Sequence, residues 1–195
     1  LAKVLKKSLK SLFPEIDQVK LIDFQGNVTP LLDSANSYSS AILSPDGLKL
    51  ALHVNGANDD LWLYHIGRKS LTRLTFGVGN NGFPAWSADG SSILYASERG
   101  KGQSIYRKRW DGSGEEERLT ISDRSQYPSS VTPDGKTLAY VQDGDIWLLP
   151  LDGSGKSSPF FESPAREANP AFSPDGKYLA YESNPSGRRE VVIVP

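Results

Sequence analysis

The sequence predicts an all-β protein: a β-propeller built of four-stranded antiparallel blades, with about four to five blades in this chain. A tight Asp-Gly turn followed by a short apolar strand occurs four times, with its Asp at positions 46, 89, 134 and 175. The steps of 43, 45 and 41 residues match the length of one propeller blade. The 18 Gly and 13 Pro in 195 residues are typical of a turn-rich all-β protein.

The best-preserved copy, Ser173-Pro174-Asp175-Gly176-Lys177-Tyr178-Leu179-Ala180-Tyr181, shows the physical design of the repeat. Pro presets φ, Asp bonds to nearby amides and Gly accepts a positive φ, so the turn Asp is predicted to be structural. In the strand, Leu and Tyr lie on one face and Ala on the other. Both faces are apolar because blade packs on blade.

Each complete repeat divides into four expected strands. First strands are expected at 38–43, 83–86 and 127–131, and second strands at 48–54, 91–97 and 136–142. Third strands are expected at 61–64, 105–108 and 146–149, and fourth strands at 71–76, 117–121 and 158–162. Partial units are expected at the two ends, at 19–24 and 28–32, and at 170–172, 178–182 and 191–194.

The domain organisation is therefore a propeller over residues 17–195, preceded by a short amphipathic helix or linker over residues 1–16. Lysines interrupt the apolar residues of the first segment, which argues against a signal peptide. No Met opens the chain, so we expect that Leu1 is not a translation start. Either these blades belong to a longer propeller, which we favour, or residues 28–32 complete the last blade. Open blade edges would favour self-association.

Composition excludes several partners. The 22 Lys and Arg balance 23 Asp and Glu, so neither nucleic acid nor an anionic membrane is an expected partner. No apolar run has the roughly 18 residues of a membrane span. Without cysteine there is no disulfide and no thiolate metal site.

The repeated string, with Arg73-Leu74-Thr75 and Arg118-Leu119-Thr120 closing blades, resembles the WD-like repeats of TolB-type propellers. Among these it looks closest to the propeller that follows the kinase domain of bacterial Ser/Thr protein kinases. That narrower resemblance rests on short strings such as 23–31, 71–76 and 145–153. No kinase motif is present, so no phosphoryl transfer is implied. The TolB-like resemblance implies a periplasmic or extracytoplasmic location.

The sequence contains no complete motif for a catalytic or cofactor-binding site. Gly77-Val78-Gly79-Asn80-Asn81-Gly82 matches a dinucleotide fingerprint in letters, but it joins two strands instead of a strand and a helix. The two histidines, His53 and His65, cannot alone build a three-ligand metal site. A cluster of Asn55 with residues 58–60 is either a weak calcium site or, as we favour, a solvated loop. We expect no catalytic residue, no metal, no cofactor and no enzyme activity.

Candidate binding residues lie on the loops that join second to third strands and blade to blade, because binding residues commonly lie on loops held by a rigid scaffold. The candidates are Tyr38, Asn80, Asn81, Phe83, Arg99, Arg124, Tyr127, Arg166, Glu167 and Asn169. Of these, Tyr38, Phe83, Tyr127 and Asn169 are expected at the starts of first strands, near the mouth of the central channel.

Three functions follow from this arrangement. We favour a non-catalytic recognition and scaffold module that binds a protein or peptide on its loop-rich face. The alternative is the substrate-gating propeller of a prolyl-oligopeptidase-like peptidase whose catalytic domain lies outside this chain. A propeller lyase with a histidine-metal site is the weakest hypothesis, because the sequence has only two histidines.

Overall fold

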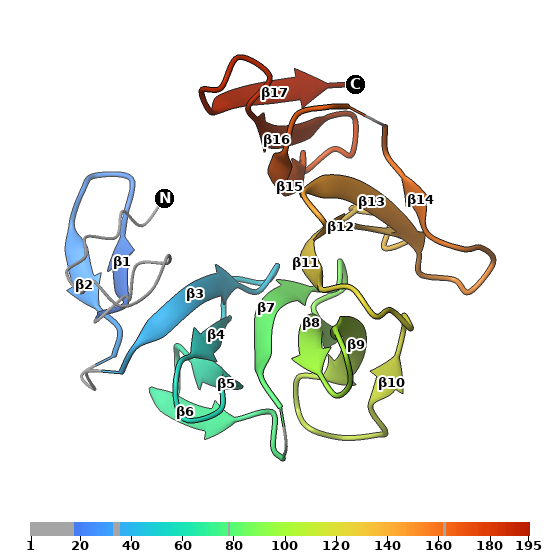
Figure 1. Cartoon of the computed structure of the whole chain (residues 1–195). Helices are drawn as coiled ribbons and strands as arrows, with labels where there is room; N and C mark the ends of the chain where they lie inside the picture. The colour runs from blue at the N-terminus through green and yellow to red at the C-terminus, as the bar shows by residue number, and fades with distance from the viewer. Residues whose placement is uncertain (1–17, 33–35, 78, 162) are drawn as a thin grey trace. The chain divides into compact units, whose positions relative to one another are not determined.

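The computed structural model describes residues 18–32, 36–77, 79–161 and 163–195. Within these ranges the chain is all-β, with seventeen strands in five antiparallel sheets (Figure 1). The fold class predicted from the sequence is confirmed. The chain divides into two compact units, residues 1–82 and 83–195, which are described separately below. Residues 1–16, predicted as a helix or linker, lie outside the described residues.

The first unit contains a two-stranded hairpin and one blade. In the hairpin, β1 (Lys20–Ile22) pairs with β2 (Val28–Pro30). The strands of the blade follow in the order β3 (Tyr38–Leu43), β4 (Lys49–Val54), β5 (Asp60–His65) and β6 (Ser70–Arg73). Side chains from both parts form one apolar cluster: Val19, Leu32, Tyr38, Leu50, Leu52 and Tyr64.

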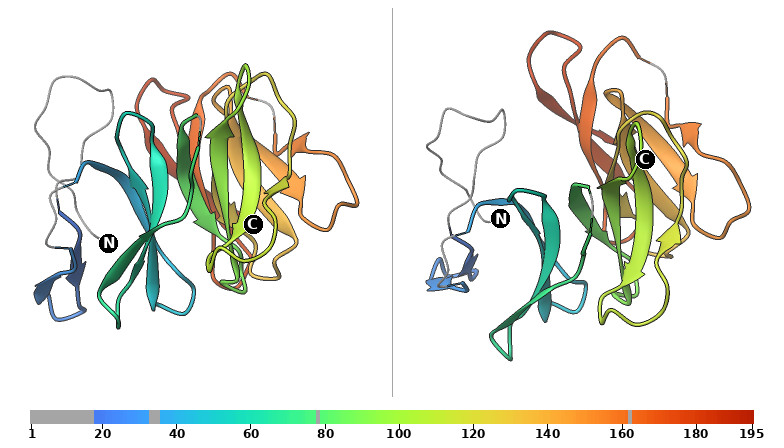
Figure 2. Two further views of the ribbon diagram at one scale, coloured as in Figure 1. Left: turned by 90° about the horizontal axis from the view of Figure 1, so that it is seen from below. Right: turned by 60° about the horizontal axis from the view of Figure 1, so that its bottom comes forward.

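The second unit contains the next two blades and a three-stranded sheet (Figures 1 and 2). Its first blade holds β7 (Asn81–Trp86, which begins at the unit boundary), β8 (Ser92–Glu98), β9 (Gln103–Arg109) and β10 (Glu117–Arg118). The second holds β11 (Gln126–Val131), β12 (Thr137–Gln142), β13 (Asp145–Pro150) and β14 (Ser158–Pro159). The last sheet holds β15 (Glu167–Phe172), β16 (Leu179–Ser183) and β17 (Glu190–Val194).

Blade packs against blade inside the second unit, as the apolar columns predict. Strand β11 contacts β8 and β9, and strand β15 contacts β12 and β13. Leu94 and Ile105 of one blade lie in the same buried cluster as Leu138 and Tyr140 of the next. Burying each such large apolar side chain contributes about 1.5–3 kcal/mol, so these interfaces stabilise the unit.

The Asp-Gly turns are structural, as predicted. In each one the Ser or Thr that opens the turn donates a hydrogen bond to the Asp carboxylate at 2.5–2.6 Å. The same carboxylate accepts the backbone N–H two residues later at 3.0–3.2 Å. The Gly that follows has a φ between 66° and 75°, in the left-handed region. The four turn carboxylates are therefore occupied by their own turns.

The expected fourth strands were too long. They end at Arg73, Arg118 and Pro159, whereas the sequence suggested ends at 76, 121 and 162. The reason is visible at Leu74 and Thr75, whose N–H groups both point to the carbonyl of Leu61, at 2.8 and 3.3 Å. Two donors on one carbonyl end the regular ladder.

The last sheet has three strands, β15, β16 and β17. Residues 28–30 form β2, which pairs with β1 inside the first unit, and the alternative that residues 28–32 complete the last blade stays a prediction. Val191 and Ile193 of β17 are exposed. That the chain forms part of a longer propeller stays a prediction.

Candidate functional site

Each blade has two different ends. The antiparallel strand order places the Asp-Gly turn and the third-to-fourth turn at one end. The other end, here named the loop-rich end, carries the loops between second and third strands and the segments that lead to the next blade. These second-to-third loops cover 55–59, 99–102, 143–144 and 184–189.

Buried side chains begin the first strands at this end. Tyr38, Asn81, Gln126 and Glu167 each lie six residues before the Ser or Thr of their turn and are 0–4% exposed. We call these four residues the first-strand column. Three of them are candidates from the sequence, but the structure places them inside the protein and not on its rim.

Phe83 and Asn169, two residues beyond the column, have φ of 54° and 53° and precede proline. A positive φ is unusual for a bulky residue. The first strands are bulged nearby, between Pro128 and Ser130 and between Ala168 and Ala171. Phe83 lies against Tyr127 of the next first strand, with ring centroids 4.5 Å apart.

The three candidate arginines differ in their surroundings. Arg99 forms an ion pair with Glu116, and its Nε donates a hydrogen bond to the Ser97 hydroxyl at 2.9 Å. Its guanidinium carbon lies 4.3 Å from the centre of the Tyr106 ring. Arg124 forms an exposed ion pair with Asp143. Arg166 has an exposed side chain, and its backbone N–H donates to Asn184 at 2.8 Å. All three arginines are exposed, and the contacts given above for Arg99 lie within its own blade.

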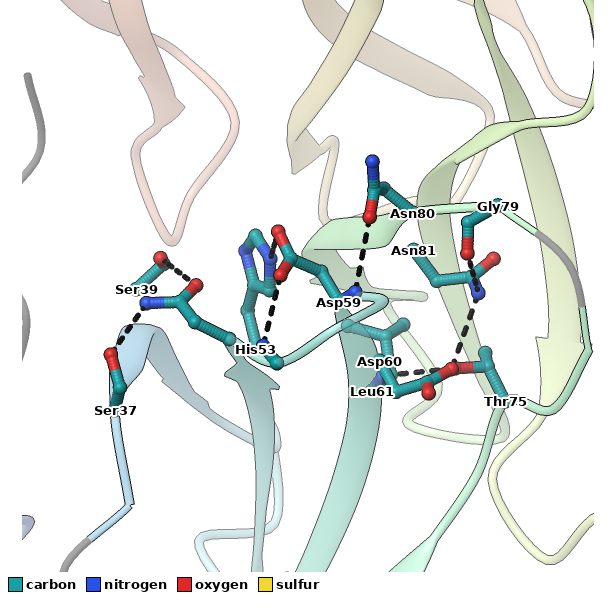
Figure 3. Close-up of polar contacts among 12 residues, drawn as sticks. Ser37, Ser39, His53, Asp59, Asp60, Leu61, Thr75, Gly79, Asn80 and Asn81 are labelled. Carbon is teal, nitrogen blue, oxygen red and sulfur yellow. Dashed lines mark hydrogen bonds and ion pairs between the residues drawn. The ribbon is translucent and has the colours of Figure 1, made fainter. Parts of the chain in front are cut away.

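A buried polar network occupies the loop-rich end of the first unit (Figure 3). The carboxylate of Asp60 accepts hydrogen bonds from the Thr75 hydroxyl at 2.7 Å and from the Asn81 amide at 3.2 Å, and it pairs with Arg73. The Thr75 oxygen in turn accepts the N–H of Leu61 at 2.9 Å. These hydrogen bonds join a third strand, the segment that follows a fourth strand and the first-strand column residue. We call such a set of hydrogen bonds a latch.

Asn55 and Asp59, two further residues of the proposed calcium cluster, also have structural partners. Asn55 exchanges hydrogen bonds with Ser37 and Ser39, at 2.8 and 2.5 Å. The backbone N–H of Asp59 donates to Asn80 at 3.1 Å, which places that candidate residue in the same network. No group of three or more His, Asp or Glu side chains in the described ranges is arranged to hold a metal ion.

His53 is enclosed in the same region. Its Nε2 lies 3.2 Å from the Asp59 carboxylate, and a Cβ added to Gly82 would lie 2.4 Å from its Cε1. Burial lowers the pKa of His53, and the neighbouring Asp59 offsets part of that shift. Gly82 is therefore required for the imidazole to fit.

A second latch has the same plan in the other unit. The Thr120 hydroxyl donates to the Gln126 side-chain carbonyl at 2.5 Å and accepts the N–H of Ile105 at 2.8 Å. Arg118 donates to the Ser104 hydroxyl at 2.9 Å. The Gln126 amide donates to Gln142 at 2.8 Å. Both polar groups of the Gln126 side chain therefore have a protein partner.

In the next blade, other residues replace the Arg and the Thr of the latch. Strand register aligns Pro159 with Arg73 and Arg118, so that Phe161 stands where the other latches have Thr75 and Thr120. The column residue here is Glu167, which is 2% exposed. Ser163 donates to its Oε1 at 2.6 Å, while its Oε2 has no hydrogen-bond partner among the described residues.

A pocket of about 340 Å³ lies beside this carboxylate. Its lining comes from the segment before β15 and from β16, β17 and the loop that joins them. The lining residues include Phe161, Ser163, Glu167, Tyr181, Asn184 and Val192. We call it the Glu167 pocket.

Sequence reasoning identified Glu167 but missed Phe161, Ser163 and Tyr181. The signal that could have found them is the break in the repeat. Arg-Leu-Thr closes two blades, and Pro159-Phe160-Phe161 stands in its place at the third. A break at a structural position indicates either a relaxed constraint or a local function.

Comparison with known proteins identifies the class. Residues 18–195 match the TolB beta propeller domain family, and the chain therefore belongs to that family. An uncharacterized protein of Agrobacterium fabrum is 34% identical over 113 residues, which cover 56% of this chain and 38% of that protein. The likeness to kinase-associated propellers stays a prediction.

Solved structures share the fold. TolB from Acinetobacter baumannii has a TM-score of 0.77 at 24% identity, over 90% of this chain and 45% of that chain. A prolyl endopeptidase has a TM-score of 0.64 at 16% identity, over 91% of this chain and 31% of that chain. The chain spans less than half the length of each of these relatives. In the part of the chain that the structure describes, no helix has the length and apolar character to cross a membrane.

Proposed function

We infer that this chain is a non-catalytic recognition module that binds a protein or peptide at its loop-rich ends. The observation that carries this proposal is the contact between Phe83 and Tyr127. Both rings are half-buried, and their centroids lie 4.5 Å apart with a tilt of 54°. Rigid aromatic side chains that keep part of their surface exposed are the preferred anchors of peptide and protein interfaces.

The backbone at Phe83 supports a binding role. A φ of 54° at a bulky residue costs about 1–3 kcal/mol, and such conformations persist where the surroundings hold them and often where function uses them. In this conformation the ring of Phe83 lies against that of Tyr127. Asn169 of the last sheet has the same backbone conformation and carries a polar side chain.

A peptide-display selection against the 195-residue chain tests this function. Peptides selected from a random library are expected to bind with affinities that Tyr127→Ala weakens about tenfold or more, as for an interface anchor. Tyr178→Ala is the matched control, because Tyr178 is an exposed aromatic next to the Asp-Gly turn at the opposite end. Failure to select any peptide, or sensitivity to Tyr178→Ala alone, would refute the proposal.

The second candidate is the substrate-gating propeller of a prolyl-oligopeptidase-like peptidase. The similarity to a prolyl endopeptidase over 91% of this chain favours it at the level of fold. This function requires a hydrolase domain in the same protein. Sequencing the encoding gene on both sides of this segment decides the point, since a gene without such a domain removes the candidate.

A further inference from the structure

We propose that the Glu167 pocket binds the basic side chain, Lys or Arg, of a peptide partner. The proposal deepens the recognition function inferred above and rests on it for the source of the ligand. It is carried by three observations of the pocket: an unsatisfied buried acceptor, uncompensated negative charge, and apolar and aromatic walls.

The acceptor is Oε2 of Glu167. The residue is 2% exposed, and Ser163 satisfies only its Oε1. A buried carboxylate oxygen without a hydrogen bond is costly, so natural proteins pair such groups. At the equivalent column positions Asn81 and Gln126 have partners in their latches. An unfilled acceptor at this one position, on a residue that lines a pocket, is explained by a donor that arrives with the ligand.

The charge balance supports a cationic ligand. In the first latch Arg73 neutralises Asp60, but at the third position the Arg is replaced by Pro159 while Asp145 occupies the place of Asp60. Within the described ranges neither Asp145 nor Glu167 forms an ion pair with a Lys or Arg of the chain. An ammonium or guanidinium group of the ligand would supply the missing positive charge.

The walls suit the alkyl stem and the head of a basic side chain. Phe161, Pro164, Pro185 and Val192 provide apolar surface for the methylene groups. The rings of Phe161 and Tyr181 lie 5.6 Å apart with a tilt of 49°. Aromatic rings beside a carboxylate attract a cation through the ring quadrupole. A volume of about 340 Å³ falls within the usual range of small-ligand pockets, large enough for one such side chain.

The test is an NMR titration of the full chain with three capped amino acids: Nα-acetyl-lysine methylamide, Nα-acetyl-arginine methylamide and the neutral norleucine analogue. A basic probe is expected to shift the amide resonances of residues 163–167 and 181–185. The norleucine probe is expected to leave them unshifted at the same concentration. The lysine and arginine arms show which head group the pocket prefers.

Glu167→Gln removes the charge while keeping the side-chain shape, and Gln already stands at the equivalent position 126. It is expected to weaken the basic probe about tenfold or more, the usual effect of a charge-assisted hydrogen bond. Glu117→Gln, at an exposed carboxylate paired with Arg107, is the matched control and should leave the titration unchanged. Phe161→Thr restores the residue of the other two latches, retains the Glu167 charge, and should also weaken binding.

Equal shifts with the norleucine probe, or unchanged binding in both Glu167→Gln and Phe161→Thr, would overturn the assignment. The outcomes separate the two proposals. If display-selected peptides bind Glu167→Gln as tightly as the unmodified chain, recognition stands and the pocket assignment falls. If no peptide is selected while the basic probes bind through Glu167, the pocket assignment stands and peptide recognition falls.

Discussion

The hydroxyl of Thr120 lies 2.5 Å from the side-chain carbonyl of Gln126 and accepts the N–H of Ile105 at 2.8 Å. One small side chain thus joins the end of a fourth strand, a third strand and the first strand of the next blade. Thr75 makes the corresponding contact with Leu61 in the first unit. The latch explains the repeated Arg-Leu-Thr string as a structural feature.

Removing the latch hydroxyl should destabilise the protein. Thr120→Val keeps the side-chain volume but leaves the buried N–H of Ile105 and the carbonyl of Gln126 without partners. We expect a loss of about 1–3 kcal/mol in the free energy of unfolding, measured by urea denaturation. Thr72→Val makes the same chemical change at an exposed strand position and should alter stability little. Equal effects of the two variants would argue against the latch.

Gly82 should not tolerate a side chain. An alanine Cβ would lie 2.4 Å from Cε1 of the buried His53 ring, so either the ring or the strand must move. The expected cost is about 1–3 kcal/mol, measured as the free energy of unfolding. Gly67→Ala is the control, because nothing lies within 4 Å of an added Cβ there. If Gly82→Ala unfolds at the same denaturant concentration as Gly67→Ala, the described packing of His53 is wrong.

His53 should make stability depend on pH. Burial holds its pKa below the ordinary value of 6.5, although Asp59 opposes the shift. Below pH 6.5 the unfolded chain therefore binds a proton that the folded chain resists, and stability falls as the pH decreases. Denaturation midpoints between pH 8 and about pH 5.5 should show this loss. His53→Gln should reduce it, and an identical pH slope in this variant would contradict the assignment.

The turn carboxylates should contribute to the stability of the fold, and that contribution should be lost in acid. The Thr132 hydroxyl first, then the backbone N–H of Lys136, holds the pKa of Asp134 below its ordinary value of 3.8. A carboxyl with a lowered pKa stabilises the fold above pH 3.8 and loses that contribution as the pH falls through its folded-state value. Asp134→Asn should therefore make the free energy of unfolding depend less steeply on pH in the acid range, and Thr132→Val should have the same effect to a smaller extent. Acid titration followed by circular dichroism tests this, and a dependence as steep in Asp134→Asn as in the unmodified chain would count against it.

Local patterns were enough to predict the strands and turns. The Asp175-Gly176 turn and the alternation of Leu179, Ala180 and Tyr181 depend on residues close together in sequence, and the structure confirms them. The fourth strands were predicted too long because the double hydrogen bond to the Leu61 carbonyl ends the ladder. No local pattern carries that information.

The roles of the site residues depend on side-chain contacts between different strands, which the sequence pattern does not reveal. Arg99 was a candidate for partner binding, but it pairs with Glu116, seventeen residues away, and lies over Tyr106. The burial of the first-strand column became visible only in the structure, where the register matches Glu167 with Gln126. Only that alignment shows that Phe161 occupies the position that corresponds to Thr120 in the preceding blade. Side-chain partners from different strands set these roles, and periodicity does not report them.

The central claim is that the loop-rich end of the last sheet offers a buried carboxylate to a basic side chain. The most direct measurement is a crystal structure of the chain soaked with Nα-acetyl-arginine methylamide. We expect a guanidinium nitrogen within hydrogen-bond distance of Glu167 Oε2, with the stem of the side chain between Phe161 and Val192. A ligand bound elsewhere, or a Glu167 pocket that holds only water at saturating ligand, would contradict it.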